Sequence, residues 1–362
     1  MNVLSSTVKR KISAHRLWLY SGQIDGACAD LSGQDLSGQD LSGVQLECAQ
    51  MLRAILSYTN LTGCNLSSAD LSECDLSRAV LKTAYLEAAR LCSSNLTGAD
   101  LTDATLDGTD LTHSNMGRAC LIGAYLGGSV LTKANLTQAD LTKANLTQAD
   151  LTEANLTQAD LTEANLYFAC LTGADMTEAC LVGAYLRGCD LSRSILASAD
   201  LTNTILTYAS LNDANLTNTD LEGANLTNAR LKGADLKGSN LKGANLTNAR
   251  LKGADLRGAN LKGADLRGAN LAGAKLKGAV LTNANLKGAN LRGADLTLVN
   301  LINASLARAN LECIDLGGAN LTSADLTDAN LTSAGLTDAN LTRANLKSTN
   351  LKGADLTDAI MP

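Results

Sequence analysis

The sequence predicts an all-β solenoid whose coils have four short sides, and two repeats of different length predict it. The shorter repeat places Leu or Met at every fifth residue from Leu31 to Met361 without interruption. The longer repeat spans twenty residues, because GANLTNARLKGADL begins at Gly223 and again at Gly243. Four five-residue sides therefore make one coil, and the chain is long enough for about 17 coils.

The composition supports a repetitive interior. The 362 residues include one Pro, one Trp and one Phe, and aromatic residues make up 2% of the chain, whereas hydrophobic residues reach 45%. Leu and Ala supply most of that hydrophobic fraction. A core of varied, interlocking large side chains is therefore excluded, and a solenoid built from one large and one small residue is favoured.

Each five-residue unit has its own division between inside and outside. A period of five forms a stripe on neither an α-helix nor a flat strand, so the chain must bend after every unit. The Leu and the small residue two positions before it, usually Ala, then point inward, and the other three residues face water. Asp or Asn normally precedes the Leu, and stacked residues such as Asp140 and Asp160 could suggest a cation site. We expect instead that each of these side chains bonds to its own turn.

The sequence predicts a short helical cap over residues 1–25 and one continuous repeat domain over residues 26–362. Ser5 or Ser6 is the expected N-cap, and apolar residues follow at near-helical spacing. Trp18 or Leu17 is expected to lie over the first coil. At the other end we expect a monomer if Pro362 blunts the last coil, and an end-to-end dimer if the C-terminal coil pairs with a second copy.

The unit Ala-(Asp/Asn)-Leu-(Thr/Ser/Lys/Arg)-(Gly or polar) resembles the repeat of the pentapeptide repeat family, from Ala29 to Met361. The preceding segment HRLWLYSGQIDGACADLSG resembles the lead-in of many bacterial members. The resemblance implies a right-handed, quadrilateral parallel β-helix with the Leu and the small residue inside. It also implies a bacterial protein, with cyanobacterial regulation of cell differentiation as one family role.

Little in the sequence points to catalysis. The chain has two His, His15 and His113, and both are expected to be solvated; the unbroken register leaves no room for a catalytic loop. We expect a non-enzyme with no cofactor and no metal. Of the ten Cys, Cys28 and Cys48 are twenty residues apart, so a disulfide between adjacent coils is conceivable. Reduced cysteines in the cytoplasm are the favoured interpretation.

The charge distribution is uneven. The net charge is −6 and the pI is about 5.0, which favours neither a membrane nor a nucleic-acid partner. Between residues 221 and 300, however, basic residues outnumber acidic ones. They form a basic belt that we interpret as solvated charge, with an anionic partner as the alternative: Lys232, Lys237, Lys242, Lys252, Arg257, Lys262, Arg267, Lys277 and Lys287.

A third surface feature comes from departures at the residue before Leu. Three apolar pairs at offsets of forty and sixty residues predict an apolar strip on two adjoining sides, made of Val80, Tyr85, Cys120, Tyr125, Cys180, Tyr185 and Ile205. The sequence therefore predicts a scaffold or regulator that binds other proteins through this strip. One alternative is a DNA-mimicking protein that binds gyrase and protects it from quinolones, and another is a purely structural rod.

Overall fold

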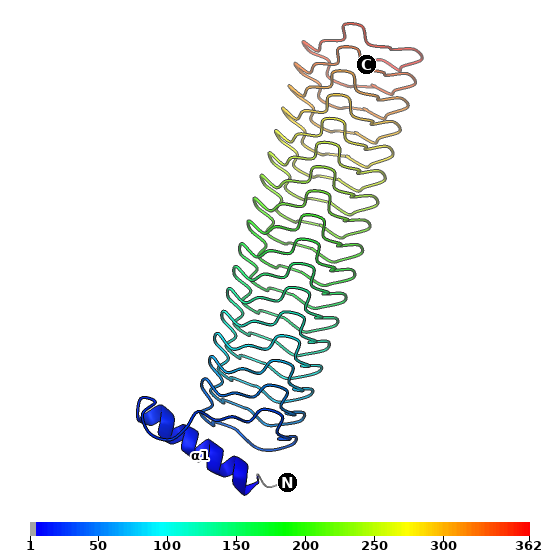
Figure 1. Cartoon of the computed structure of the whole chain (residues 1–362). Helices are drawn as coiled ribbons and strands as arrows, with labels where there is room; N and C mark the ends of the chain where they lie inside the picture. Colours follow the sequence, from blue (N-terminus) through cyan, green and yellow to red (C-terminus); the bar gives the residue numbers. More distant parts are fainter. Residues whose placement is uncertain (1–4) are drawn as a thin grey trace. The chain divides into compact units, whose positions relative to one another are not determined.

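The computed structural model describes residues 5–362. The chain divides into two units, Met1–Cys180 and Leu181–Pro362. Both units consist of stacked coils, and each coil contains twenty residues. The first unit also contains a helix at its N-terminal end (Figure 1).

Helix α1 (Ser6–Tyr20) is the one helix within residues 5–362. Ser5 is its N-cap, and the Ser5 hydroxyl accepts a hydrogen bond from the Val8 N–H at 3.2 Å. The predicted helix is therefore present. Of the two residues expected over the first coil, Leu17 is 54% exposed and does not cover it, whereas Trp18 is half-buried. The buried residues of α1 are Val8 and His15.

Parallel β-bridges connect each coil to the next in both units. Each bridge joins two residues that lie twenty positions apart, such as Asn135 and Asn155 in the first unit and Asp235 and Asp255 in the second. The bridging residue is always the one before the inward Leu or Met. The predicted β-helix with four five-residue sides per coil is therefore what the chain forms (Figure 1).

The corners between sides are tight turns with one residue in the left-handed region. The φ angle is positive at every fifth residue from Gly33 to Asp358, two positions after each inward residue. The N–H that follows it bonds back across the turn, as Ala134 N–H does to the Leu131 carbonyl at 2.9 Å. This combination is typical of a type II turn, whose third residue favours Gly. It explains why Gly is frequent at that position of the repeat.

The backbone N–H groups of a unit have a regular set of partners. In the unit around Leu136, the Leu136 N–H donates to Asn155 and the Gln138 N–H donates to Thr157 in the next coil, whereas the Asn135 N–H donates to Ser114 in the preceding coil. A fourth N–H closes the turn. The fifth, that of Thr137, donates to the Asn135 side chain at 3.1 Å. The Asp or Asn before each Leu thus completes the hydrogen bonding of its own turn, as predicted.

The core of each unit is a dry stack of Leu and small residues. Leu136, Leu141 and the other central Leu between Leu31 and Leu341 are at most 1% exposed, and the Ala two positions before them is buried as well. Cys64, Cys74 and Cys189 occupy the same small inward position and are buried. No helix among the described residues has the length and apolar character needed to cross a membrane.

Candidate interaction surface

The residues of the predicted apolar strip divide between the two units, and in the first unit they lie on two neighbouring sides of the coils with polar residues between them. In the first unit, bridges place Asp100 between Val80 and Cys120, and Thr105 between Tyr85 and Tyr125. Cys180 follows Cys120 along the same ladder after two Asp residues. In the second unit, Tyr185 and Ile205 are direct bridge partners. The tyrosine rings are about half exposed, so they are available to a partner.

One coil of the first unit carries more apolar surface than the strip prediction included. In the coil at residues 119–138, the residues before three consecutive inward Leu are Cys120, Tyr125 and Val130, and Ile122 adds a further apolar side chain at a corner. Ile122 and Val130 are each 37% exposed, and Tyr125 is 49% exposed. We call Cys120, Ile122, Tyr125 and Val130 the apolar arc. Its sequence signal was the loss of Asp or Asn at three consecutive units.

Two carboxylates of the preceding coil, Asp103 and Asp107, lie close to the backbone of Gly123 and Gly127 at the corners of this arc. A Cβ atom placed on Gly123 would lie 2.5 Å from Asp103 Oδ1, and one placed on Gly127 would lie 2.6 Å from Asp107 Oδ1. The missing side chains therefore leave room for the two Asp side chains beside Ile122 and Tyr125. The arc is therefore bordered by negative charge that comes from the preceding coil, and these two carboxylates belong to what we call its acidic edge.

The basic belt of the second unit is partly neutralised by its own neighbours. Arg257 and Arg267 bond to Asp255 and Asp265 at 2.7 and 2.6 Å, and Lys242 bonds to Glu222 at 2.7 Å. These contacts lower the pKa of Asp255 and Asp265, mainly through the side-chain hydrogen bond from the guanidinium. The other pair is Lys237 with Asp235, at 2.6 Å. Four of the nine belt residues are thus paired at the surface, which reduces the positive charge that the belt offers to an anion.

The cysteines fall into inward and outward groups. Burial raises the pKa of Cys64 and of Cys74 to about 12, so these thiols remain protonated and act as small apolar groups. Cys28 and Cys48 are both free thiols, and the Cys28 thiol donates to the Cys48 carbonyl at 3.2 Å. Burial also raises the pKa of both thiols, which lowers their reactivity at neutral pH.

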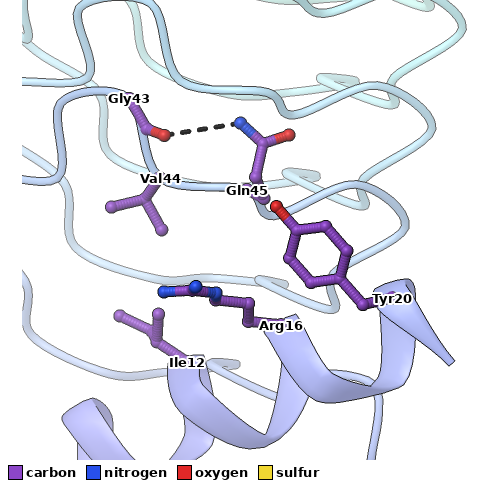
Figure 2. Close-up of a pocket in the computed structure, with 6 residues that line it drawn as sticks. All are labelled: Ile12, Arg16, Tyr20, Gly43, Val44 and Gln45. Atoms are coloured by element: carbon purple, nitrogen blue, oxygen red, sulfur yellow. Dashed lines mark hydrogen bonds between the residues drawn. The ribbon is translucent and has the colours of Figure 1, made fainter.

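A shallow cavity separates α1 from the first coils (Figure 2). Ile12, Arg16 and Tyr20 approach from the helix, and Gly43, Val44 and Gln45 line the facing coil. The Arg16 guanidinium lies 5.7 Å from the centre of the Tyr20 ring. On the buried side of α1, His15 is fully buried and its Nδ1 accepts the Ala29 N–H at 3.0 Å. The expectation that His15 is solvated is therefore wrong, whereas His113 is exposed as expected.

Coils of four five-residue turns, stacked at twenty-residue intervals around inward Leu, define a β-helix protein. The sequence model of pentapeptide repeats matches this chain in overlapping segments from residue 27 to residue 361. The chain belongs to the pentapeptide repeat family, and its β-helix is right-handed as in that family. Proteins of this family are generally non-catalytic structural or interaction proteins.

Several solved structures are similar to this chain. HetL from Nostoc sp. strain PCC 7120, a pentapeptide repeat protein involved in heterocyst differentiation regulation, is 38% identical over 61% of this chain and 90% of its own, with a TM-score of 0.28. Rfr23 from Cyanothece 51142 is 38% identical over 26% of this chain and 64% of its own, with a TM-score of 0.25. QnrB1, a plasmid-mediated fluoroquinolone resistance protein, is 25% identical over 49% and 89%, with a TM-score of 0.35. A search among curated proteins found no match.

Proposed function

We propose that this chain is a non-catalytic scaffold that binds other proteins through apolar residues on the outer faces of its coils. One observation carries the proposal. The residue before each Leu normally completes the hydrogen bonding of the turn, yet the strip replaces it with Val80, Tyr85, Tyr125 or Tyr185. Such residues give up a hydrogen bond and expose apolar area, which the fold itself does not require.

The cellular setting belongs to the same proposal. We place the protein in the cytoplasm of a bacterium, where a scaffold of this kind would regulate other proteins, with cyanobacterial cell differentiation as the specific context. Its oligomeric state stays a prediction, either a monomer or an end-to-end dimer through the C-terminal coil. Light scattering on the purified full chain distinguishes the two states.

Affinity capture from the native cell extract tests the proposal. The bait is the full chain, compared with a variant that carries Tyr125→Ser and Tyr185→Ser. We expect one or more proteins to be retained by the wild-type chain and lost from the variant. A Tyr208→Ser variant is the matched control, because Tyr208 is exposed but lies at a corner outside the strip. Equal retention by all three baits would contradict a role of the strip.

A second candidate function is a DNA mimic that binds gyrase. The observation that favours it is an excess of acidic over basic residues between residues 17 and 220, including carboxylates such as Asp103 and Asp107 that have no ion-pair partner among residues 5–362. A DNA supercoiling assay tests it directly. Unchanged gyrase activity and unchanged quinolone sensitivity at micromolar protein would remove this candidate. A purely structural role would remain if neither assay finds a partner.

A further inference from the structure

We propose that the apolar arc of the first unit, together with its acidic edge, is a docking surface for a cationic protein segment that carries apolar side chains. The inference rests on the proposed scaffold function and specifies the chemistry of one partner. The acidic edge consists of Asp103 and Asp107 from the preceding coil and Asp140 and Asp150 from the following coil.

The apolar arc lacks hydrogen bonds that most other units of the repeat make. In most units of the repeat, an Asp or Asn oxygen accepts the N–H two residues later, as Asn135 and Asn145 do at 3.1 and 3.2 Å. With Cys120, Tyr125 and Val130 in that position, the N–H groups of Ile122, Gly127 and Thr132 have no hydrogen-bond partner within residues 5–362. Three consecutive turns therefore lack the bond that their neighbours make.

The packing of this coil does not compensate for the missing hydrogen bonds. The backbone ladder through this coil is intact, since the Tyr125 N–H donates to Ala104 at 2.9 Å and the Leu121 N–H donates to Asp140 at 2.7 Å. The inward Leu121 and Leu126 are fully buried, like the other inward residues up to Leu341. Ile122, Tyr125 and Val130 remain 37–49% exposed and Cys120 is half-buried, so the arc leaves a large part of its apolar area in contact with water.

The surface of the arc has few protruding side chains at its corners. The arc follows three consecutive sides of one coil, and its corners are glycine-rich, at Gly123 and at Gly127–Gly128. Gly128 has nothing within 4 Å of the place where its Cβ would lie. No side chain projects from Gly127 or Gly128 themselves, but the Asp107 carboxylate of the preceding coil occupies the space beside Gly127. A partner that contacts the tyrosine ring and the valine side chain together therefore meets the Asp107 carboxylate at the corner between them.

The surface around the arc is negatively charged. No basic nitrogen lies within 4.0 Å of the Asp103, Asp107, Asp140 or Asp150 carboxylates in the described part of the chain. The nearby cations are already engaged, because Lys133 pairs with Glu153 at 3.5 Å and Lys143 pairs with Glu163 at 3.7 Å. The negative charge is therefore available to a partner. It attracts a cationic segment and repels nucleic acid or an anionic membrane.

A binding experiment with a defined probe tests the proposal. The probe is a fluorescein-labelled peptide of alternating Lys and Leu, and its anisotropy is measured against the purified full chain. A matched peptide of alternating Glu and Leu tests the sign of the charge. We expect the Lys–Leu peptide to bind and the Glu–Leu peptide not to bind. If the wild-type chain binds neither peptide, or binds both equally, the proposal is wrong.

The decisive variant restores the repeat in the arc with Cys120→Asp, Tyr125→Asn and Val130→Asn. It adds a negative charge and returns three missing side-chain acceptors, so it is expected to fold at least as well as the wild type. We expect its affinity for the Lys–Leu peptide to fall by about tenfold or more, because the apolar anchors are gone. The control is Val280→Asn, which restores the same bond in the second unit and should leave the affinity unchanged. Equal affinity of the arc variant and the wild type would overturn the proposal.

The edge is tested separately with Asp103→Asn combined with Asp107→Asn. We expect weaker binding and a smaller dependence of the affinity on salt, because two charges that attract the peptide are removed. Unchanged affinity and salt dependence would exclude these carboxylates from the surface. If these experiments contradict the docking proposal, the scaffold function can still be tested. Capture of a protein from cell extract through Tyr185 in the second unit does not depend on the arc.

Discussion

The side-chain oxygen Oδ1 of Asn135 accepts two hydrogen bonds from Thr137, one from the backbone N–H at 3.1 Å and one from the hydroxyl at 2.6 Å. The same pair of bonds recurs between Asn145 and Thr147. This relationship explains why the repeat prefers Asp or Asn before Leu, and Thr or Ser after it. Units that have another residue before Leu lack these two hydrogen bonds.

Replacing Asn135 tests that relationship. Asn135→Ala removes the acceptor for the Thr137 N–H, and we expect the chain to lose about 1 kcal/mol of stability. Asn135→Asp is the control, because Asp keeps the acceptor and occupies the same position two coils further on, at Asp175. Both variants lose the Asn135 Nδ2 donation to Asn115 Oδ1 at 2.9 Å, so they differ in the acceptor for Thr137. The measurement is the midpoint of urea unfolding of the full chain. Identical midpoints for the Ala and Asp variants would show that the side-chain bond contributes nothing.

Truncating one inward Leu tests the role of the core. Leu146 is fully buried, so Leu146→Ala leaves a cavity and is expected to cost about 2–5 kcal/mol. Gln148→Ala changes an exposed residue of the same unit and should shift the unfolding midpoint little. Thermal melts followed by circular dichroism compare the two variants. A similar midpoint for both would be inconsistent with a stacked Leu core.

Gly26 fixes the approach of α1 to the first coil. Its φ is +84°, and a Cβ there would lie 2.8 Å from the Trp18 backbone nitrogen and closer still to the Ala14 carbonyl oxygen. Because backbone atoms cannot move aside, Gly26→Ala is expected to displace α1. Gly33→Ala is the control, since its φ is +64° and nothing lies within 4 Å of its added Cβ. Hydrogen exchange of the α1 amides should rise in the first variant only, and equal exchange in both would contradict this account.

The docking of α1 is expected to depend on pH through His15. Because Nδ1 accepts the Ala29 N–H at 3.0 Å, the docked imidazole is neutral; burial lowers the pKa of His15 from its ordinary value of 6.5, although nearby Glu47 opposes the shift. A lowered folded-state pKa means that the unfolded or undocked state binds more protons as the pH falls. The stabilisation is therefore complete above pH 6.5 and is lost as the pH falls below it.

Trp18 reports this equilibrium, because it is the one Trp of the chain and its ring stacks on His15 at 5.5 Å. We expect the fluorescence of Trp18 to change as the pH is lowered from about 7.5 to about 5. His15→Asn is the control, since an amide oxygen can accept the Ala29 N–H but does not titrate. A flat fluorescence profile in the wild-type chain, or the same profile in the variant, would contradict a role for His15.

Thiol labelling separates inward from outward cysteines. The pKa of Cys64 and of Cys74 is raised to about 12 by burial, so neither should react with iodoacetamide at about pH 8 in the native chain. Cys313 is exposed and should be labelled. Mass spectrometry after digestion identifies the labelled positions. Labelling of Cys64 at the rate of Cys313 would show that the small inward position is open to solvent.

The repeat itself could be predicted from sequence because its causes are local. Each five-residue unit contains its own turn, its own buried Leu and its own hydrogen bond from a backbone N–H to the Asp or Asn side chain. Periodicity alone therefore shows which residues point inward. The burial of His15 and the exposure of Leu17 could not be predicted in this way, because they depend on which side of α1 meets the first coil. The acidic edge was missed for a similar reason, since Asp103 reaches the arc from a different coil.

The central claim is that apolar residues before Leu weaken the fold slightly and are present for binding. The melting temperature of Tyr125→Asn measures this most directly, because the substitution restores the side-chain acceptor for the Gly127 N–H and removes an exposed ring. The account predicts a melting temperature equal to or above that of the wild-type chain. A clear decrease would show that Tyr125 stabilises the coil and would contradict the claim.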